Sequence, residues 1–385
     1  MFNFTTLPPL SLYLHFPWCV RKCPYCDFNS HAVKDHIPET EYINALITDL
    51  EQELPLIWGR PVNSIFLGGG TPSLFSPAAL DRLFSALRAR LVFSSDIEIT
   101  LEANPGAIER QRFSEYRAVG INRLSIGVQS FNDNHLQKLG RIHNRRDAYN
   151  AAEAAHAAGL DNFNLDLMFA LPQQTLIQAL SDLDEAMALE PTHISWYQLT
   201  IEPNTLFHQQ PPTLPSDDNS WEMQQQGKEK LAAAGYTQYE VSAYARGAQC
   251  QHNLNYWRFG DYLGIGAGAH GKITRADAQT ISRRWKIKQP AAYLRDADSK
   301  SRLGGQQELS ENDASLEFMM NSLRLQQGFS TELFMQHTGL PLSIIEEPLR
   351  KAEEKGWIQW QKNQIMPTKN GHCFLNNLLG LFLAD

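Results

Sequence analysis

The chain has 385 residues, enough for two or three domains of roughly 150 residues each. Apolar residues make up 43% and charged residues 20%, which is typical of a globular protein and excludes a disordered, collagen-like or coiled-coil chain. With 34 Lys and Arg against 42 Asp and Glu, the net charge of −8 argues against a nucleic-acid binder, which needs a basic surface.

We expect a cytoplasmic protein. No Lys or Arg precedes Arg21, and no clean apolar segment ends in small residues, so a secretory signal is not predicted. No apolar stretch reaches the roughly 20 residues that cross a bilayer, although peripheral contact with a membrane stays open. Three of the five cysteines lie within eight residues, and the odd number favours metal or redox chemistry over a disulfide framework.

Apolar, β-rich segments alternate with amphipathic segments through the first half of the chain. The expected strands are 11–16, 64–67, 97–101, 123–127, 162–168 and 194–200, and the expected helices are 41–54, 78–91, 110–118, 148–158 and 176–189. This alternation predicts an α/β protein with parallel strands, either a doubly wound sheet or a partial or full barrel. Periodicity alone does not separate these architectures.

The alternation fades after residue 203, and we expect three regions. They are a core of residues 1–240, an extension of residues 241–298 and a C-terminal domain of residues 299–385 that begins with a polar, glycine-containing linker at 299–308. Helical patterns at 313–325, 331–337 and 341–355, followed by a short strand pair near 357–360, predict a small, mainly helical, winged-helix-like domain.

The cysteines of the loop after the first strand have the spacing C-x-x-x-C-x-x-C, as Cys19, Cys23 and Cys26. Three thiolates on one loop can hold a [4Fe-4S] cluster by three irons and leave the fourth iron without a protein ligand. Such an iron can chelate the amino and carboxylate groups of S-adenosylmethionine and deliver an electron to its sulfonium. The alternatives are a zinc site or three unrelated thiols, but structural zinc usually takes four ligands as two pairs, and no second pair exists here.

Other polar and glycine signals cluster where the expected strands end. Glycines without β-carbons at Gly68–Gly70 permit close backbone approach, although a tight turn alone would explain them. Glu102 can accept hydrogen bonds from hydroxyls or an ammonium group, and Arg141 offers a planar fork for a carboxylate. Because the carboxyl ends of parallel strands share one rim, these residues are expected to meet there.

Six motifs occur in order: YLHFPWCVRKCPYCDF, GGGTPS, LEANPG, RLSIGVQSF, LGRIH and HNLNYW. With them the chain resembles, over essentially its whole length, the radical S-adenosylmethionine superfamily, in the branch of oxygen-independent coproporphyrinogen dehydrogenases and haem chaperones. The resemblance implies a partial (β/α)6-type barrel and a cluster held by the three loop cysteines. It also implies S-adenosylmethionine binding by Tyr13, Tyr25, Gly69, Gly70, Thr71, Glu102, Gln129, Arg141 and Asp166.

Two features separate the branches. The dehydrogenases carry a fourth cysteine two residues after the third, where this chain has Phe28, and their longer N-terminal segment has no counterpart in the 18 residues before Cys19. In HNLNYW, His252 can give haem iron an axial imidazole while the aromatic rings cover the macrocycle. The alternative is a core histidine beside packing aromatics, and Cys250 is either a competing ligand or a small buried side chain.

The resemblance therefore favours a haem chaperone that receives electrons from a donor and delivers haem to respiratory proteins. The open alternatives are a radical enzyme that decarboxylates coproporphyrinogen III or another tetrapyrrole, and one with an unrelated substrate. Six basic residues between Lys272 and Lys288, against the single acid Asp277, could meet haem propionates or anionic lipid, but we predict a solvated face.

Overall fold

The computed structural model describes residues 1–383, except for the side chains of residues 107–110. Its centre is a set of six parallel strands that neighbour one another in chain order. They are β1 (Leu10–Phe16), β4 (Pro61–Gly69), β5 (Val92–Ala103), β6 (Arg123–Gln129), β7 (Phe163–Phe169) and β8 (His193–Gln198). All six expected strands are confirmed. A doubly wound sheet requires a point at which the strand order reverses. The order of these six strands never reverses, so the architecture is the partial barrel.

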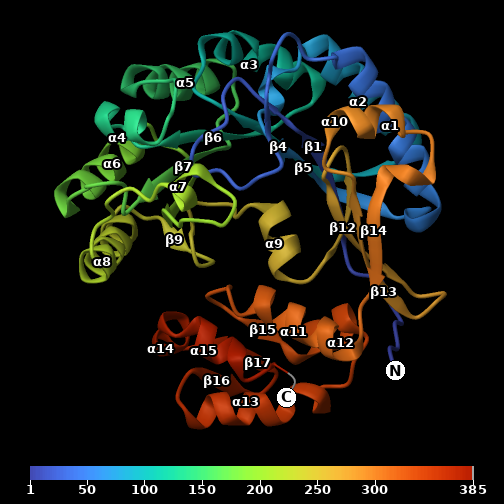
Figure 1. Cartoon of the computed structure of the whole chain (residues 1–385). Helices are drawn as coiled ribbons and strands as arrows, with labels where there is room; N and C mark the ends of the chain where they lie inside the picture. The colour runs from blue at the N-terminus through green and yellow to red at the C-terminus, as the bar shows by residue number, and fades with distance from the viewer. Residues whose placement is uncertain (384–385) are drawn as a thin grey trace.

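Helices cover the outer face of this curved sheet (Figure 1). They are α1 (Glu39–Ile57), α2 (Pro77–Arg90), α3 (Ala107–Val119), α4 (Asp133–Lys138), α5 (Arg145–Ala157), α6 (Leu176–Ala188) and α8 (Asp217–Ala233). Side chains that cap the first turn fix several starts: Ser76 accepts from the amide of Ala79, and α5 and α6 begin with capping boxes at Asn144 and Thr175. The barrel core lies between this helical layer and the sheet.

Further strands extend the barrel at both edges into a 12-stranded sheet. Beside β8 lie β10 (Ala243–Ala245) and β9 (Thr237–Gln238), and beside β1 lie β11 (Asp261–Ile265), β12 (His270–Arg275), β13 (Thr280–Lys286) and β14 (Leu303–Glu308). Here β11 runs parallel to β1, and the strands beyond it are antiparallel. The helices α7 (Leu206–Gln209), α9 (Gln251–Trp257) and α10 (Pro290–Arg295) complete this part of the chain.

The predicted linker at 299–308 is wrong, because most of it is β14, the edge strand that pairs with β13. Its glycines meet the ring of Trp285 rather than loosening the chain. A β-carbon on Gly305 would lie 2.3 Å from Cζ2 of Trp285, so no larger side chain fits while the indole covers this strand.

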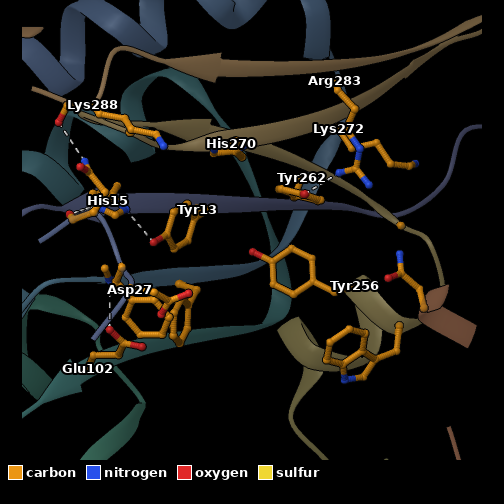
Figure 2. Close-up of a pocket in the computed structure, with 18 residues that line it drawn as sticks. Tyr13, His15, Asp27, Glu102, Tyr256, Tyr262, His270, Lys272, Arg283 and Lys288 are labelled. Carbon is orange, nitrogen blue, oxygen red and sulfur yellow. Dashed lines mark hydrogen bonds between the residues drawn. The ribbon is translucent and has the colours of Figure 1, made fainter. Parts of the chain in front are cut away.

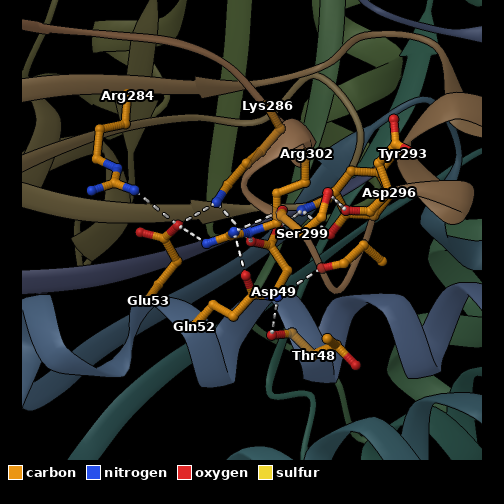
Figure 3. A network of polar contacts seen from close by, with 12 residues as sticks. Thr48, Asp49, Gln52, Glu53, Arg284, Lys286, Tyr293, Asp296, Ser299 and Arg302 are labelled. Atoms are coloured by element: carbon orange, nitrogen blue, oxygen red, sulfur yellow. Dashed lines mark hydrogen bonds and ion pairs between the residues drawn. The ribbon is translucent and has the colours of Figure 1, made fainter.

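The predicted solvated basic face is also wrong for two of its lysines, Lys272 and Lys286, which are buried. Nζ of Lys272 lies 2.8 Å from Oδ1 of Asp261, and Nζ of Lys286 lies 2.6 Å from Oδ1 of Asp49. Figure 3 shows the second of these contacts within a network in which α1 is tied to β13 and to the segment before β14. Buried cations persist here because acids from distant elements pair with them.

The C-terminal domain has its own hydrophobic core, to which Phe4 of the N-terminal segment also belongs. Its helices are α11 (Glu311–Ser322), α12 (Thr331–Thr338), α13 (Ser343–Glu354), α14 (Lys369–Cys373) and α15 (Leu375–Gly380), and its sheet holds β15 (Phe329–Ser330), β17 (Gln364–Pro367) and β16 (Ile358–Gln361) in that order. The expected helices and strand pair are confirmed. Within residues 1–383, no helix is long and apolar enough to cross a membrane.

Candidate functional site

The cysteine loop leaves β1 through β2 (Trp18–Cys19), which pairs with β3 (His31–Ala32). All three thiols are half-buried, and none forms a disulfide. Oγ1 of Thr71 donates to Sγ of Cys19 at 3.4 Å, and Nη1 of Arg141 donates to Sγ of Cys23 at 3.7 Å.

Burial raises the pKa of Cys19 and of Cys26, so both sulfurs are protonated thiols until a cation replaces the proton. Three unlinked sulfurs on one loop, two of them already accepting hydrogen bonds, fit the ligands of an iron–sulfur cluster.

A cavity of about 920 Å³ opens at the carboxyl ends of the parallel strands, and the cysteine loop forms part of its wall. We call it the rim cavity. The sequence-predicted residues that line it are Cys19, Cys23, Tyr25, Cys26, Gly69, Gly70, Thr71, Glu102, Gln129, Arg141 and Asp166. Tyr13 and His252 are not among its lining residues. The structure thus brings together all but two of the expected residues.

Two carboxyl groups face the rim cavity from neighbouring parts of the sheet. The amide of Gly69 donates to Oε2 of Glu102 at 3.1 Å, while Oδ2 and Oδ1 of Asp166 accept from Ser125 at 3.0 Å and from Asn164 at 2.8 Å. Burial, together with the charge of Asp166, raises the pKa of Glu102 to about 8. Glu102 is therefore mostly protonated at neutral pH until a bound cationic group favours its ionised form.

The guanidinium group of Arg141 has a buried N–H donor without a hydrogen-bond partner among the residues that the structure describes. Its Nη2 donates to the carbonyl of Gly127 at 2.6 Å and to Oδ1 of Asn104 at 2.7 Å. Its Nε is buried and has no hydrogen-bond partner among the described residues. A buried donor without a partner is uncommon in native proteins and indicates that a ligand group satisfies it.

Gln129 ends β6 in a left-handed conformation, with φ of 67°, which a residue with a side chain rarely adopts away from functional sites. Its Oε1 accepts a hydrogen bond from the hydroxyl of Tyr197 at 3.0 Å. This turn aims the Gln129 side chain across the rim cavity toward β8.

Packing against the end of β1 and the start of the cysteine loop explains why residues 69 and 70 are glycines. A β-carbon on Gly70 would lie 2.6 Å from the carbonyl oxygen of Trp18 and 2.7 Å from that of Phe16, and one on Gly69, where φ is 108°, would meet the ring of His15. Close approach of the cysteine-loop backbone therefore requires these glycines. Their contact with a cofactor stays a prediction.

A second cavity of about 560 Å³ lies between β1, the antiparallel extension and α9 (Figure 2). We call it the aromatic cavity. Its lining includes Tyr13, Phe66, Tyr256, Trp257 and Tyr262 as aromatic residues, Lys272, Arg283 and Lys288 as cations, and His15 and His270. Asp27, Phe28, Gly69 and Glu102 line both cavities, so the two adjoin.

Tyr13 points into the aromatic cavity (Figure 2) and is not among the residues that line the rim cavity. Its hydroxyl lies 2.8 Å from Nδ1 of His15, whose Nε2 lies 2.9 Å from the carbonyl oxygen of Asn29. Both ring nitrogens of His15 are therefore engaged, and the predicted contact of Tyr13 with S-adenosylmethionine stays a prediction.

His252 lies at the buried start of α9 and lines neither cavity. Its Nδ1 is 3.2 Å from Oε1 of Glu98 and 3.0 Å from Sγ of Cys250, and its ring lies 4.2 Å from that of Phe66. Burial opposes ionisation of Glu98, but the hydrogen bond with His252 and the charge of Arg123 outweigh it and lower the pKa of Glu98 to about 2. The other end of the motif, at Tyr256, does line the aromatic cavity.

Sequence reasoning missed several lining residues of the two cavities. Asn104 follows β5 and Tyr197 is the last residue but one of β8, so the rule that polar strand ends converge could have found them, whereas Ser125 lies inside β6. Tyr262 lies on β11 and His270 on β12, where no repeated pattern singled them out.

Comparison with known proteins matches this arrangement. A family model described as the Radical SAM superfamily matches residues 13–186, and one described as the HemN C-terminal domain matches residues 309–374. A solved structure described as coproporphyrinogen III oxidase (HemN) from Escherichia coli, a radical SAM enzyme, has a TM-score of 0.82 and 25% identity, and the match covers 98% of this chain and 90% of that one.

Proteins named Heme chaperone HemW are similar over their whole length. The Escherichia coli and Haemophilus influenzae proteins are each 50% identical, with 98% of this chain and 99% of theirs covered. The Bacillus subtilis protein is 33% identical, with 97% and 99% covered. The fold and the cysteine loop thus define a radical SAM protein. Within that superfamily, the chain belongs to the family of the HemW proteins.

Proposed function

We propose that this protein is a cytoplasmic haem chaperone, which binds a [4Fe-4S] cluster, S-adenosylmethionine and haem and delivers haem to haem-requiring respiratory proteins. The observation that carries the proposal is 50% identity over nearly the whole chain to relatives named Heme chaperone HemW. The three free thiols at the rim cavity and the adjoining aromatic cavity support the same assignment.

In this proposal Cys19, Cys23 and Cys26 hold the cluster at the mouth of the rim cavity. When bound, the cluster supplies an electron for reductive cleavage of the sulfonium of S-adenosylmethionine. Glu102, deprotonated on contact with a cation, accepts from the ammonium group or the ribose hydroxyls, and the unpartnered Nε of Arg141 donates to an acceptor of the ligand. Gln129, Asp166, Tyr25, Gly69, Gly70 and Thr71 complete the binding surface.

Haem binding is assigned to the region around α9, where the sequence predicts an axial role for His252. In the described conformation Nδ1 of His252 contacts Glu98 and Cys250, and its ring packs on Phe66, which lines the aromatic cavity, whereas His252 does not. Direct ligation by His252 therefore requires its imidazole to turn away from Glu98. This role stays a prediction.

The alternative function is oxygen-independent oxidation of coproporphyrinogen III, which the shared fold with HemN supports. Phe28 stands where the dehydrogenases carry a fourth cysteine. Its exposed ring lines both cavities and offers neither a metal ligand nor an acid–base group.

The test uses the full chain, reconstituted anaerobically with iron and sulfide. Haemin is titrated into one sample, which is then mixed with a haem-free globin as acceptor. A parallel sample receives reductant, S-adenosylmethionine and coproporphyrinogen III. Stoichiometric haem binding followed by transfer to the globin, without formation of protoporphyrinogen IX, is the expected result. Absence of haem binding, or conversion of the porphyrinogen, would contradict the chaperone function.

A further inference from the structure

The aromatic cavity is shaped for a flat, apolar ligand. Tyr13 and Phe66 stack with centroids 6.1 Å apart and an interplanar angle of 16°, and Tyr256 and Tyr262 contact edge to face at 4.7 Å. These four rings line a space of about 560 Å³, which falls within the roughly 300–1,000 Å³ range of ligand sites. Aromatic walls of this kind cover the faces of planar ring systems.

Two polar groups of residues that line the aromatic cavity lack a partner among the residues described. Nε1 of Trp257 is buried and has no hydrogen-bond partner in the described part of the chain. Lys272 and Arg283 are paired with Asp261 and Glu317, whereas Lys288 is exposed and has no ion pair among residues 1–383. An exposed ammonium group that lines the cavity and has no ion pair with a described residue favours a ligand with a carboxylate.

His270 differs from the other histidines of this region. It begins β12 with an exposed side chain that lines the aromatic cavity, and its ring stacks beside Trp285 at 6.2 Å. Neither ring nitrogen has a hydrogen-bond partner among the described residues. Partial burial and the charges of Lys288 and Arg283 lower the pKa of His270, so the imidazole is neutral at pH 7 and keeps a lone pair for a metal.

We propose that the aromatic cavity is the haem site and that His270 supplies an axial ligand to the iron. The proposal rests on the haem-chaperone function above and names the site that the function uses. A haem here lies against the aromatic rings, with its carboxylates near Lys288. His270 enters from the β12 wall and Tyr256 from the α9 wall (Figure 2), so a ligand on β12 leaves the face toward α9 free.

On this assignment His252 is a positioning residue in the described conformation. Its contacts with Glu98 and Cys250 anchor the start of α9, five residues before Trp257, and so hold Tyr256 and Trp257 against the aromatic cavity. A turn of His252 toward the cavity would supply the second axial position of the same haem. The two histidines are therefore separable by experiment.

The first test compares His270→Ala with His36→Ala, an exposed histidine outside both cavities, in the full chain. Haemin is titrated and the spectrum of the haem-free protein subtracted. We expect His270→Ala to weaken haemin binding at least tenfold and to shift the Soret band, and His36→Ala to change neither. Metal-free protoporphyrin IX needs the cavity but no side chain to ligate an iron, so it should bind both variants as it binds the wild type. Added imidazole should replace the missing iron ligand and restore the Soret band of His270→Ala.

The second test fills the cavity instead of removing the ligand. Asn321 of α11 lines the aromatic cavity, whereas Asn376 of α15 is exposed elsewhere. Asn321→Trp should weaken both haemin and protoporphyrin IX binding at least tenfold and leave the cluster iron content unchanged, and Asn376→Trp should bind both like the wild type.

The outcomes distinguish failure of the haem-chaperone function from failure of the proposed haem site. A wild-type protein that binds no haem overturns the haem-chaperone function and this site with it. A wild-type protein that binds haem, while His270→Ala keeps the wild-type spectrum and affinity, overturns only the role of His270. Unchanged haemin binding in Asn321→Trp overturns the aromatic cavity as the site.

Discussion

Cys23 and Cys373 are both free thiols, but their surroundings differ. Cys23 lies among three sulfurs that face one cavity, and Cys373 is exposed on α14. We expect Cys23→Ala to lose the visible absorption of the cluster and most of its iron, because two thiolates hold a [4Fe-4S] cluster poorly. Cys373→Ala should keep both. Iron and sulfide analysis after anaerobic reconstitution checks this, and equal iron contents in the two variants would remove the metal assignment.

Glu102 makes the stability of the metal-free protein depend on pH. Its pKa is raised from 4.5 to about 8, so between these values the folded protein holds a proton that the unfolded chain has released. Stability from this group is therefore present below about pH 4.5 and declines as the pH rises to 8, by at most about 1.4 kcal/mol per pH unit. Water that reaches the cavity reduces this slope.

The variant Glu102→Gln removes the titration and keeps the shape. The melting temperature of the variant minus that of the wild type should increase as the pH rises from 5 to 8. Thermal unfolding of the metal-free protein at each pH measures this difference. A matched variant, Glu346→Gln, changes an exposed carboxyl on α13 and should show no such trend. Parallel pH profiles for wild type and Glu102→Gln would contradict the raised pKa.

The sequence predicts residue types at the site better than it predicts their orientation. Glu102 was expected at the rim because parallel strands end there, and Gln129 and Asp166 because the family resemblance implies them. His252 faces Glu98, a residue 154 positions away on β5, and no local pattern carries that contact. Tyr13 lines the aromatic cavity, and its expected contact with S-adenosylmethionine stays a prediction; the sequence did not show which cavity its side chain faces.

At the scale of elements, the barrel edge is held by a buried ion network. Nζ of Lys286 lies 2.6 Å from Oδ1 of Asp49 and 2.7 Å from Oε1 of Glu53, both on α1 (Figure 3). Lys286→Met leaves two buried carboxylates with fewer partners and should lower the free energy of unfolding by roughly 3–5 kcal/mol. Arg350→Met breaks an exposed pair with Glu346 and should cost less than about 1 kcal/mol. Urea denaturation compares them, and equal midpoints would contradict the structural role of the network.

Contacts between elements far apart in the sequence explain why two expectations about elements failed. The run from Lys272 to Lys288 looks solvated because its acidic partners, including Asp49 and Asp261, lie outside it in the sequence. Segment 299–308 looks like a linker because its glycines are conspicuous, yet Trp285 needs them. Barrel strands and helices were predicted well because their periodicity is local, whereas both failures involve pairing across elements.

At the scale of the molecule, the C-terminal domain closes one side of the aromatic cavity. Asn321 of α11 contributes to its lining, and Oγ of Ser322 donates to the carbonyl of Trp257 at 3.0 Å. From α12, Nδ1 of His337 lies 2.6 Å from the carbonyl oxygen of Arg258, just after α9. The domain is thus fixed to the same helix that carries two of the cavity's aromatic rings, so docking and cavity shape are coupled.

This docking should weaken in acid. Burial lowers the pKa of His337 from 6.5 to about 4, so between these values the unfolded chain binds a proton that the folded protein does not. The stability from His337 is present above pH 6.5 and is lost as the pH falls toward 4, by at most about 1.4 kcal/mol per pH unit. His15 and His143, with pKa values also lowered to about 4, destabilise the barrel in the same range, so a local measurement is needed.

Hydrogen exchange of α12 and of the Arg258 end of α9 supplies that measurement, with His337→Gln as the comparison. A glutamine amide can still donate to the Arg258 carbonyl but cannot take up a proton. At pH 7.5 the two proteins should protect α12 equally. At pH 5 the wild type should exchange faster there than the variant, because protonation of His337 favours the undocked domain. Equal protection at pH 5 would mean that this histidine does not control how the C-terminal domain closes the aromatic cavity.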